Sequence, residues 1–415
     1  MQGKALPGFR DFYPEDLTLR NHIFATWRNV ARAYGFEEYD GPPLESLDMY
    51  TQKSGEEIVQ QLYSFRDKGD REVALRPEMT PTLARMVAAR VQALKKPIRW
   101  FSIPQLFRYE RQQRGRLREH FQLNMDIIGE AGALADAELM AAAVDIMRAL
   151  GLGSRDVKLR VSDRRLLKAL LAHHGISDAQ LPAAFAVIDR SERVPKDVLG
   201  QMLQEAGYGK KHVEAVFEVA LLHGEGALNA GGEAAEPLRQ AIQALVSMGL
   251  GDFVSVDLTI VRGLAYYTGI VWELFDAQKA LRAIAGGGRY DGLLDLPALG
   301  FGMGDVVLSE LLKERGVAPK ASTELGAFLI AVGGDDLPVI LKLAHALRER
   351  GIAVEYGLRH TGVRKQLELA AARGAPRAVI VGPEERQAGT AVVRDLNAGT
   401  EAKVPLDKLF NGYFD

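Results

Sequence analysis

The alternation of apolar and polar residues is densest between Arg99 and Gly129, where it predicts two antiparallel strands joined by a basic loop. Apolar and aromatic residues dominate from Arg99 to Arg108, as expected for a pleated strand. The loop from Arg111 to Arg118 carries four arginines, two glutamines and one glycine. Such a loop is too polar for a core, and its guanidinium groups suit a polyanion.

The second strand of this hairpin alternates strictly from Phe121 onward. Gln122, Asn124 and Asp126 therefore share one face of it. If Arg108 leaves the neighbouring strand on the same face, a guanidinium, an amide and a carboxylate lie together and could hold a zwitterion or a phosphate. The alternative is a hairpin whose polar face is only solvated, since antiparallel sheets often expose one face to water.

The rest of the chain divides by its changing periodicity, helical in some stretches and strand-like in others. In chain order the pattern predicts a helix over 16–34, a strand over 36–39, a helix over 81–94, the hairpin, a helix over 134–150 and a strand over 157–161. Ser162 or Asp163 can then cap a helix that begins at Arg164.

Residues 165–250 have a wholly helical pattern, which makes them a candidate inserted subdomain. Strand character returns over 253–275. A polar linker over 313–324 leads into alternating strands and helices, which predict a compact α/β domain of about 90 residues at 325–415.

Composition narrows the functional classes. At about 150 residues each, 415 residues suggest two or three domains. The 52 Lys and Arg balance 54 Asp and Glu, so a nucleic acid would have to be held by local patches. The absence of cysteine excludes disulfides and thiol catalysis. No apolar run is long enough for a membrane span, and the charged first twenty residues do not resemble a signal peptide. We expect a cytoplasmic protein.

Three further stretches carry candidate chemistry. Glu78 follows a proline in VALRPEMT and could pair with a substrate ammonium, although an exposed glutamate after proline is often only solvated. Arg262 and Tyr267 interrupt a strand-like run, which suggests close approach of a ligand to the backbone. Glycine-rich stretches at 285–294 and 299–312 would let a flat ligand lie on the backbone. We expect no metal site, because the adjacent His173 and His174 point about 100° apart on a helix.

Several ordered blocks now carry a resemblance: LPGFRDFYP, LRPEMT, FRYER, GRLREHFQ, VRGLAYYTG, AGGGRYDGL and GFGMG. In this order they resemble the histidyl-tRNA synthetases, a family of class II aminoacyl-tRNA synthetases. The resemblance implies an α+β catalytic domain on an antiparallel sheet (1–164 and 251–318), a helical insertion domain (165–250) and a C-terminal α/β anticodon-binding domain (325–415). It also implies a homodimer formed through the segment around Pro43.

The family's functional positions carry over residue by residue. Arg262 and Arg108 would be catalytic, flanking the α-phosphate of ATP and the histidine carboxylate. The predicted histidine-binding residues are Glu78, Thr80, Gln122, Asp126, Tyr266, Tyr267 and Tyr290. The predicted ATP-binding residues are Arg108, Glu110, Arg116 and His120. Arg111 and Gln113 would meet the tRNA acceptor end, and Mg²⁺ would enter with ATP. The substrates implied are ATP, L-histidine and histidine tRNA.

The chain departs from the family pattern at several positions. Ala265 stands where the family has Asp, and His120 stands where an aromatic residue usually stacks on adenine. Val307 occupies the position of an arginine that ordinarily ends the third class II motif, so one phosphate-side charge is missing or supplied from elsewhere. These departures leave an alternative, a catalytically inactive paralogue that serves as the histidine-sensing regulatory subunit of ATP phosphoribosyltransferase.

Overall fold

The computed structural model describes residues 3–53, 59–111, 113–262, 267–278, 281–292, 295–319, 325–359 and 361–414, without the side chains at 52 and 53. It separates into two compact units, Met1–Pro319 and Lys320–Asp415. Each unit has its own sheet and its own apolar core. Among the residues described, every helix is too short or too polar to cross a bilayer.

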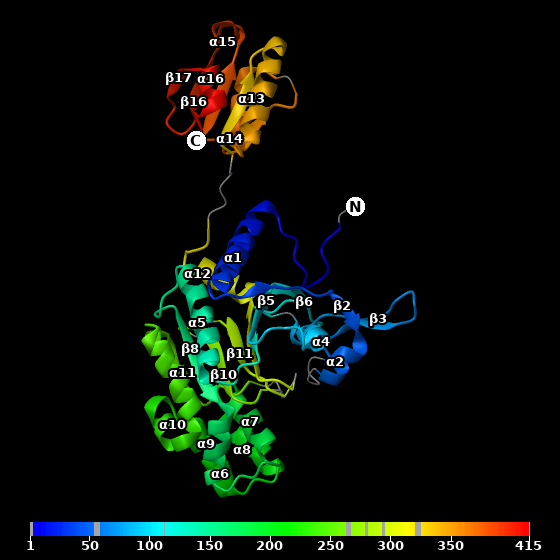
Figure 1. Ribbon diagram of the computed structural model, residues 1–415, viewed down its shortest axis with the longest axis vertical. Coiled ribbons are helices and arrows are strands. Elements are labelled where there is room, and N and C mark those ends of the chain that lie inside the picture. Colours follow the sequence, from blue (N-terminus) through cyan, green and yellow to red (C-terminus); the bar gives the residue numbers. More distant parts are fainter. Residues whose placement is uncertain are drawn as a thin grey trace. The chain divides into compact units, whose positions relative to one another are not determined.

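A large sheet organises the first unit, with strand order β1-β5-β7-β12-β11-β10-β8-β9 and with β6 paired to β7 (Figure 1). Its neighbours are antiparallel except for the parallel pairs β1–β5 and β8–β9. The strands are β1 (Glu37–Glu38), β5 (Ile98–Ser102), β6 (Gln105–Phe107), β7 (Glu119–Ile128), β8 (Val157–Asp163), β9 (Val254–Val256), β10 (Ile270–Asp276), β11 (Ala285–Arg289) and β12 (Ala298–Gly304).

Three helices cover one face of this sheet: α1 (Pro14–Ala33), α5 (Ala133–Ala149) and α12 (Asp305–Glu314). The alternation of β7 explains which face they cover. Leu123, Met125 and Ile127 are buried in the core formed with these helices, so the polar residues of the same strand face the other way. The helix-covered face of the sheet forms the hydrophobic core, and the polar side chains of β7 lie on the opposite face.

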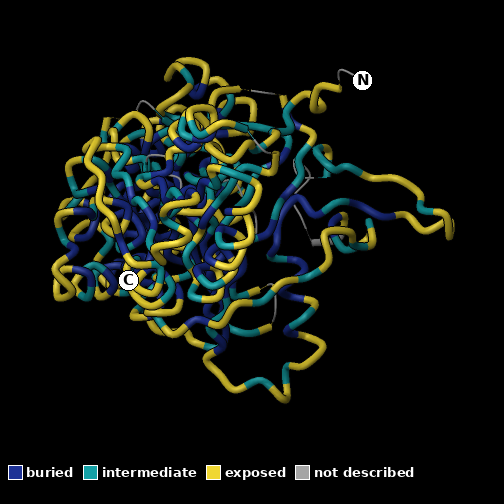
Figure 2. Tube along the Cα trace, turned by 90° about the horizontal axis from the view of Figure 1, so that it is seen from above, coloured by how far each residue is buried: buried dark blue, intermediate teal, exposed yellow. Residues whose placement is uncertain are grey.

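The opposite face carries a smaller apolar cluster that includes Leu83 of α4 (Thr80–Arg90) together with Tyr267 and Tyr290. Beside α4 lie α2 (Leu47–Lys53) and a small antiparallel sheet of β2 (Leu44–Ser46), β4 (Glu72–Leu75) and β3 (Tyr63–Arg66). The β3–β4 hairpin projects outward, and Figure 2 shows its outer part as exposed.

Between β8 and β9 the chain is helical: α6 (Arg164–His173), α7 (Leu181–Arg190), α8 (Lys196–Glu205), α9 (Lys210–Ala220), α10 (Gly224–Ala230), η1 (Gly232–Ala235), α11 (Glu236–Ser247) and η2 (Gly251–Phe253). The Asp163 side chain caps α6 by accepting a hydrogen bond from the Arg165 N–H at 2.7 Å, as the sequence predicts. Helix α11 packs on α5.

The second unit is a sheet of order β14-β13-β15-β16-β17. Its elements are β13 (Ala327–Ala331), η3 (Gly334–Asp336), α13 (Leu337–Glu349), β14 (Val354–Tyr356), α14 (Val363–Ala372), β15 (Arg377–Val381), α15 (Pro383–Ala388), β16 (Thr390–Asp395), β17 (Glu401–Pro405) and α16 (Leu406–Asn411). Its first three strands are parallel, in keeping with the predicted α/β alternation.

The structure corrects several predicted elements. The first hairpin strand, expected over 99–108, breaks into β5 and β6 around Pro104, which has no N–H for the ladder. The strand expected from Phe253 ends at Val256, because the Asp257 carboxylate accepts hydrogen bonds from the N–H and hydroxyl of Thr259 and forms a turn. Helix α12 extends through Glu314, so the linker begins later than predicted. The pattern also missed α15 and β17.

Candidate active site

A cavity of about 1150 Å³ opens on the uncovered side of the main sheet. It is strongly charged. The arginines that line it are Arg108, Arg114, Arg116, Arg160, Arg193, Arg262 and Arg282. The acidic residues that line it are Glu110, Asp189, Glu192 and Glu273. An excess of guanidinium groups in a concave site favours an anionic ligand.

Arg108 and two arginines of the basic loop, Arg114 and Arg116, line the cavity, and each is held by a defined contact. Arg108 donates from Nε to the Pro77 carbonyl at 2.9 Å. The Nε of Arg116 lies 2.5 Å from a carboxylate oxygen of the buried Glu110. Arg114 pairs with two glutamates of α12. Fixed guanidinium groups need little reorganisation when a phosphate arrives.

Arg262 enters the cavity from a strained backbone. Its φ is +57°, a left-handed conformation that costs energy for a residue with a side chain. The guanidinium lies against Gly286 on β11, where an added Cβ would come within 1.7 Å of Nη1. Its Nε is 4.0 Å from a carboxylate oxygen of Glu273. The glycine of β11 therefore makes room for this cation.

Asp126 is buried on β7, with 4% of its surface exposed. Tyr290 donates a hydrogen bond to its Oδ1 at 2.5 Å. The carboxylate lies over Gly300 of β12, where an added Cβ would be only 2.0 Å from the same oxygen. Burial raises the pKa of Asp126 to about 7, and the Tyr290 hydrogen bond opposes the rise. A buried carboxylate of this kind discriminates strongly between ligands that can and cannot hydrogen-bond to it.

Glu78 is buried immediately before α4, so the solvated alternative for this glutamate is wrong. Thr80 is the first residue of that helix. Tyr267 is also buried, and the Cζ of Arg262 lies 5.3 Å from the centre of its ring. These contacts bring the Glu78 carboxylate, the Tyr267 ring and the Arg262 guanidinium into one region.

Gln122 connects this region to the cavity. It lines the cavity and donates from Nε2 to Asn124 Oδ1 at 3.0 Å. Asn124 and Asp126 are buried, so the merely solvated hairpin face is wrong at these positions. Gln122 and Asp126 take up the space over Gly302 and Gly300, whereas an added Cβ at Gly304 would meet nothing within 4 Å. The room for a ligand that the glycines were expected to provide is thus used largely by the protein's own side chains.

His120 also lines the cavity. Burial, together with the positive charge of Arg108, lowers the pKa of His120 to about 3. The imidazole is therefore neutral at pH 7, which suits stacking on a ring better than binding a phosphate.

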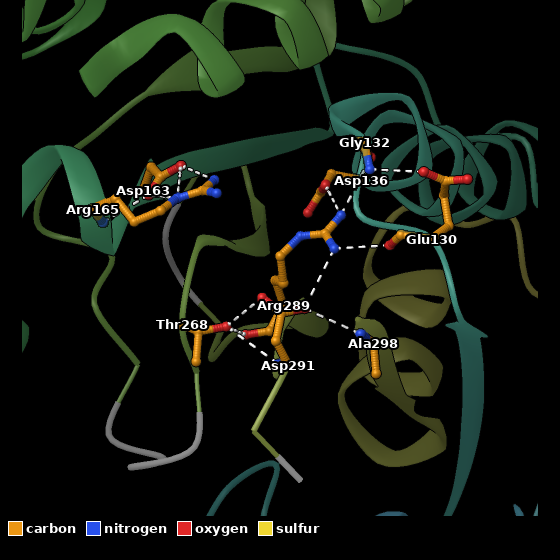
Figure 3. A network of polar contacts seen from close by, with 9 residues as sticks. All are labelled: Glu130, Gly132, Asp136, Asp163, Arg165, Thr268, Arg289, Asp291 and Ala298. Carbon is orange, nitrogen blue, oxygen red and sulfur yellow. Dashed lines mark hydrogen bonds and ion pairs between the residues drawn. The ribbon is translucent and has the colours of Figure 1, made fainter. Parts of the chain in front are cut away.

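A polar network that is buried at Arg289 and Asp136 and reaches the surface at Asp291 holds β11 and the residues that follow it (Figure 3). Arg289 donates from Nη2 to Asp136 of α5 at 2.5 Å and from Nη1 to the Glu130 carbonyl at 2.9 Å. Asp291 accepts from the Ala298 N–H at 3.1 Å and from the Thr268 hydroxyl at 3.0 Å. Tyr290 lies between these two anchored residues, so the network positions the phenol that meets Asp126.

The first turn of α12 carries no arginine, and an apolar side chain packs where the family pattern has that positive charge. Val307, at the position of the family's arginine, is buried and lines the cavity. Asp305 accepts from the Phe121 N–H at 2.9 Å and from Arg10 Nη1 at 2.9 Å. Arg10 also pairs with Glu119 at 2.6 Å. Asp305 thus joins the N-terminal segment to β7 and contributes no positive charge.

The structure brings together most of the residues that the sequence predicts. The predicted residues that line the cavity are Arg108, Glu110, Gln113, Arg116, His120, Gln122 and Arg262. Arg111 is exposed. Tyr266 and Ala265 lie outside the described residues. The sequence analysis missed other charged residues that line the same cavity: Arg160, Glu273, Arg282, and Asp189, Glu192 and Arg193 of the helical segment between β8 and β9. Nothing in the local pattern marks them, since ordinary helices, strands and loops carry such residues.

Comparison with known proteins gives matches over nearly the whole chain. The Histidyl-tRNA synthetase family model matches residues 8–304, and the Anticodon binding domain model matches residues 327–412. The histidine–tRNA ligase of Opitutus terrae is 43% identical over 98% of this chain and 97% of its own length. The chloroplastic/mitochondrial histidine–tRNA ligase of Arabidopsis thaliana is 40% identical over 97% of this chain and 85% of its own length.

A solved structure shows the same fold. The histidyl-tRNA synthetase of Nostoc sp. superposes with a TM-score of 0.84 at 24% identity, covering 99% of this chain and 98% of its own. The shared fold and the two domain matches define the class as a class II aminoacyl-tRNA synthetase with a C-terminal anticodon-binding domain. The 43% identity with the Opitutus terrae ligase, over nearly the full length of both chains, identifies the family within this class. The chain belongs to the histidyl-tRNA synthetase family, the histidine–tRNA ligases.

Proposed function

We propose that this chain activates L-histidine with ATP and transfers the histidyl group to the 3′ end of histidine tRNA. One observation carries the proposal. A buried carboxylate region around Asp126 and a cavity rich in guanidinium groups adjoin at Gln122 and Arg262. The first suits a zwitterion with an imidazole, and the second suits a triphosphate.

Histidine is placed in the buried region. Asp126 and Tyr267 hold the imidazole, with Tyr290 fixing the orientation of the Asp126 carboxylate through its hydrogen bond. Glu78, Thr80 and Gln122 receive the α-ammonium. Tyr266 completes the set by resemblance. An amino acid without a ring N–H leaves the buried Asp126 with the Tyr290 hydrogen bond alone, which disfavours the binding of that amino acid.

ATP is placed in the cavity, with His120 against the adenine, Glu110 nearby and Arg116 toward the outer phosphates. An oxygen of the histidine carboxylate attacks the α-phosphorus. The bond from the α-phosphorus to the bridging oxygen breaks, and its electron pair leaves with pyrophosphate. Arg108 and Arg262 meet the negative charge that grows on the α-phosphate oxygens. No protein nucleophile is required, because positioning and electrostatics supply the acceleration.

Mg²⁺ enters as part of the nucleotide substrate. In this proposal the cation is bound through the phosphates of ATP. In the second step the ribose hydroxyl of the tRNA attacks the histidyl carbonyl, and AMP leaves. Gln113 on the cavity wall and the exposed Arg111 are placed in the proposal at the acceptor end.

The unit at 325–415 binds the anticodon in this scheme, and the helical segment 165–250 is an insertion into the catalytic domain of 1–164 and 251–318. The enzyme is proposed to work as a cytoplasmic homodimer joined around Pro43. Apolar side chains of the small sheet support this assignment, since Phe65 and Leu44 are 50% and 36% exposed. Analytical ultracentrifugation of the purified chain tests the dimer.

The decisive experiment is histidine-dependent exchange of labelled pyrophosphate into ATP, without tRNA. We expect exchange with histidine and none with the other amino acids. No exchange, with histidine still bound in calorimetry, would overturn the proposal in favour of a histidine-sensing regulatory protein.

A further inference from the structure

Arg282 lines the cavity from the connection between β10 and β11. It is exposed to the cavity and forms neither a hydrogen bond nor an ion pair with the residues that the structure describes. Each of the other arginines lining the cavity has a carboxylate oxygen within 4.0 Å. Arg282 therefore stands out as a cation that the neighbouring described side chains do not neutralise directly.

The side chains of Arg282 and Val307 both approach Gly115. A Cβ added at Gly115 would lie 3.2 Å from Val307 Cγ2 and 3.9 Å from Arg282 Cδ. Both side chains thus border the same point on the cavity wall. Helix α12 provides no guanidinium at Val307, but the connection between β10 and β11 brings one, that of Arg282, to the same part of the cavity wall.

The charges around Arg282 support an anionic ligand. Its surroundings lower its pKa, through burial first and then through the positive charge of Arg116, while Glu110 acts in the opposite sense. Arg193 and Glu273 make smaller contributions of opposite sign. Two neighbouring guanidinium groups facing one cavity repel each other, and a polyphosphate placed between them relieves that repulsion.

We propose that Arg282 binds the outer phosphates of ATP and, together with Arg116, stabilises the pyrophosphate leaving group. This assignment rests on the proposed function and names the residue that serves in place of an arginine at Val307. As the bond between the α-phosphorus and the bridging oxygen breaks, the electron pair moves onto pyrophosphate. A cation at the outer phosphates meets this charge, whereas Arg108 and Arg262 meet the charge at the α-phosphate.

The test compares the full-length chain with its Arg282→Gln variant by calorimetry with Mg·ATP and with AMP, and by pyrophosphate exchange. Losing one charge-assisted contact should weaken ATP binding and lower kcat/KM for ATP by about tenfold to a hundredfold. AMP affinity and the KM for histidine should stay within about twofold, since neither ligand has outer phosphates. Arg148→Gln, which removes an exposed guanidinium paired with Asp145 on α5, is the matched control and should resemble the wild type.

The proposal would be overturned if Arg282→Gln bound ATP as tightly as the wild type. It would also be overturned if the variant unfolded at the same temperature as the wild type but lost affinity for ATP and AMP equally. If the glutamine variant unfolds early, Arg282→Lys takes its place and the same comparison of ATP with AMP decides. If the wild-type chain showed no histidine-dependent pyrophosphate exchange, the proposed function would be overturned. The comparison of ATP and AMP affinities would still test whether Arg282 binds the outer phosphates.

Discussion

Substituting Gly300 with alanine should damage histidine recognition while sparing the nucleotide. Gly300 pairs with Asp126 across β12 and β7. The added Cβ would fall 2.0 Å from Asp126 Oδ1, 2.8 Å from its Cγ and 3.0 Å from the Met125 carbonyl oxygen. The carboxylate must therefore move, and its hydrogen bond with Tyr290 must lengthen or break.

The magnitude follows from two effects. Overpacking of this kind costs about 1–3 kcal/mol of stability. Loss of the proposed charged hydrogen bond from the histidine imidazole to Asp126 costs about 1.5–3 kcal/mol, or about tenfold to a hundredfold in kcat/KM for histidine. Pyrophosphate exchange at varied histidine and saturating ATP measures this loss. Calorimetry with ATP should give an affinity within about twofold of the wild type, because the cavity arginines are untouched.

Gly209→Ala is the matched control, since Gly209 has φ −71° and an added Cβ would meet nothing within 4 Å. A Gly300→Ala enzyme with wild-type kcat/KM for histidine would refute the packing argument. A loss of ATP affinity as large as the loss for histidine would show that the strain spreads through the sheet instead of acting on Asp126.

Three further predictions follow from the same geometry. Burial raises the pKa of Asp126 from 3.8 to about 7, so between these pH values the native state retains a proton that the unfolded state releases, and the stability of the wild type falls as the pH rises. Urea unfolding should therefore show that Asp126→Asn gains up to about 4 kcal/mol of stability relative to the wild type from pH 4 to pH 7. A stability difference that does not change with pH would contradict the raised pKa. Arg262→His should abolish adenylate formation in the exchange assay and keep histidine binding in calorimetry, whereas unchanged exchange would remove Arg262 from the mechanism. Deleting residues 325–415, a separate compact unit, should weaken tRNA aminoacylation far more than exchange, and equal losses in the two assays would make that unit structural support.

The sequence predicts those parts of the fold in which a local pattern decides the outcome. The alternation of β7 was sufficient to place Gln122 and Asp126 on the face opposite the helices, because one face of a buried strand must be apolar. The helical segment and the C-terminal alternation were also predicted. Short connections were not, since Pro104 and the Asp257 turn interrupt runs that are apolar enough to continue as strands.

The candidate site was predicted only where motifs mark it. The glycine-rich stretches can be recognised in the sequence, but the side chains that occupy the space above them cannot. Only the folded structure shows that Asp126 lies over Gly300 and Arg262 over Gly286. Arg282 carries no local signal. Its proposed role depends on its closeness to Val307, and two strands, β11 and β12, separate these two residues in the sequence. Relations of this kind exist only once the chain has folded.

The order of the strands has a consequence for how the enzyme is made. The strand β12 lies between β7 and β11, yet it is the last strand of that sheet to leave the ribosome. Before β12 is made, the strands already synthesised can form only two separate parts of the sheet, one ending at β7 and the other at β11. Each part has an edge of unpaired backbone groups where β12 will bind. The main sheet can thus be completed only by the insertion of a central strand, after which only α12 and a short segment of this unit remain to be made. Any delay before residue 304 prolongs a stage at which unpaired strand edges can aggregate.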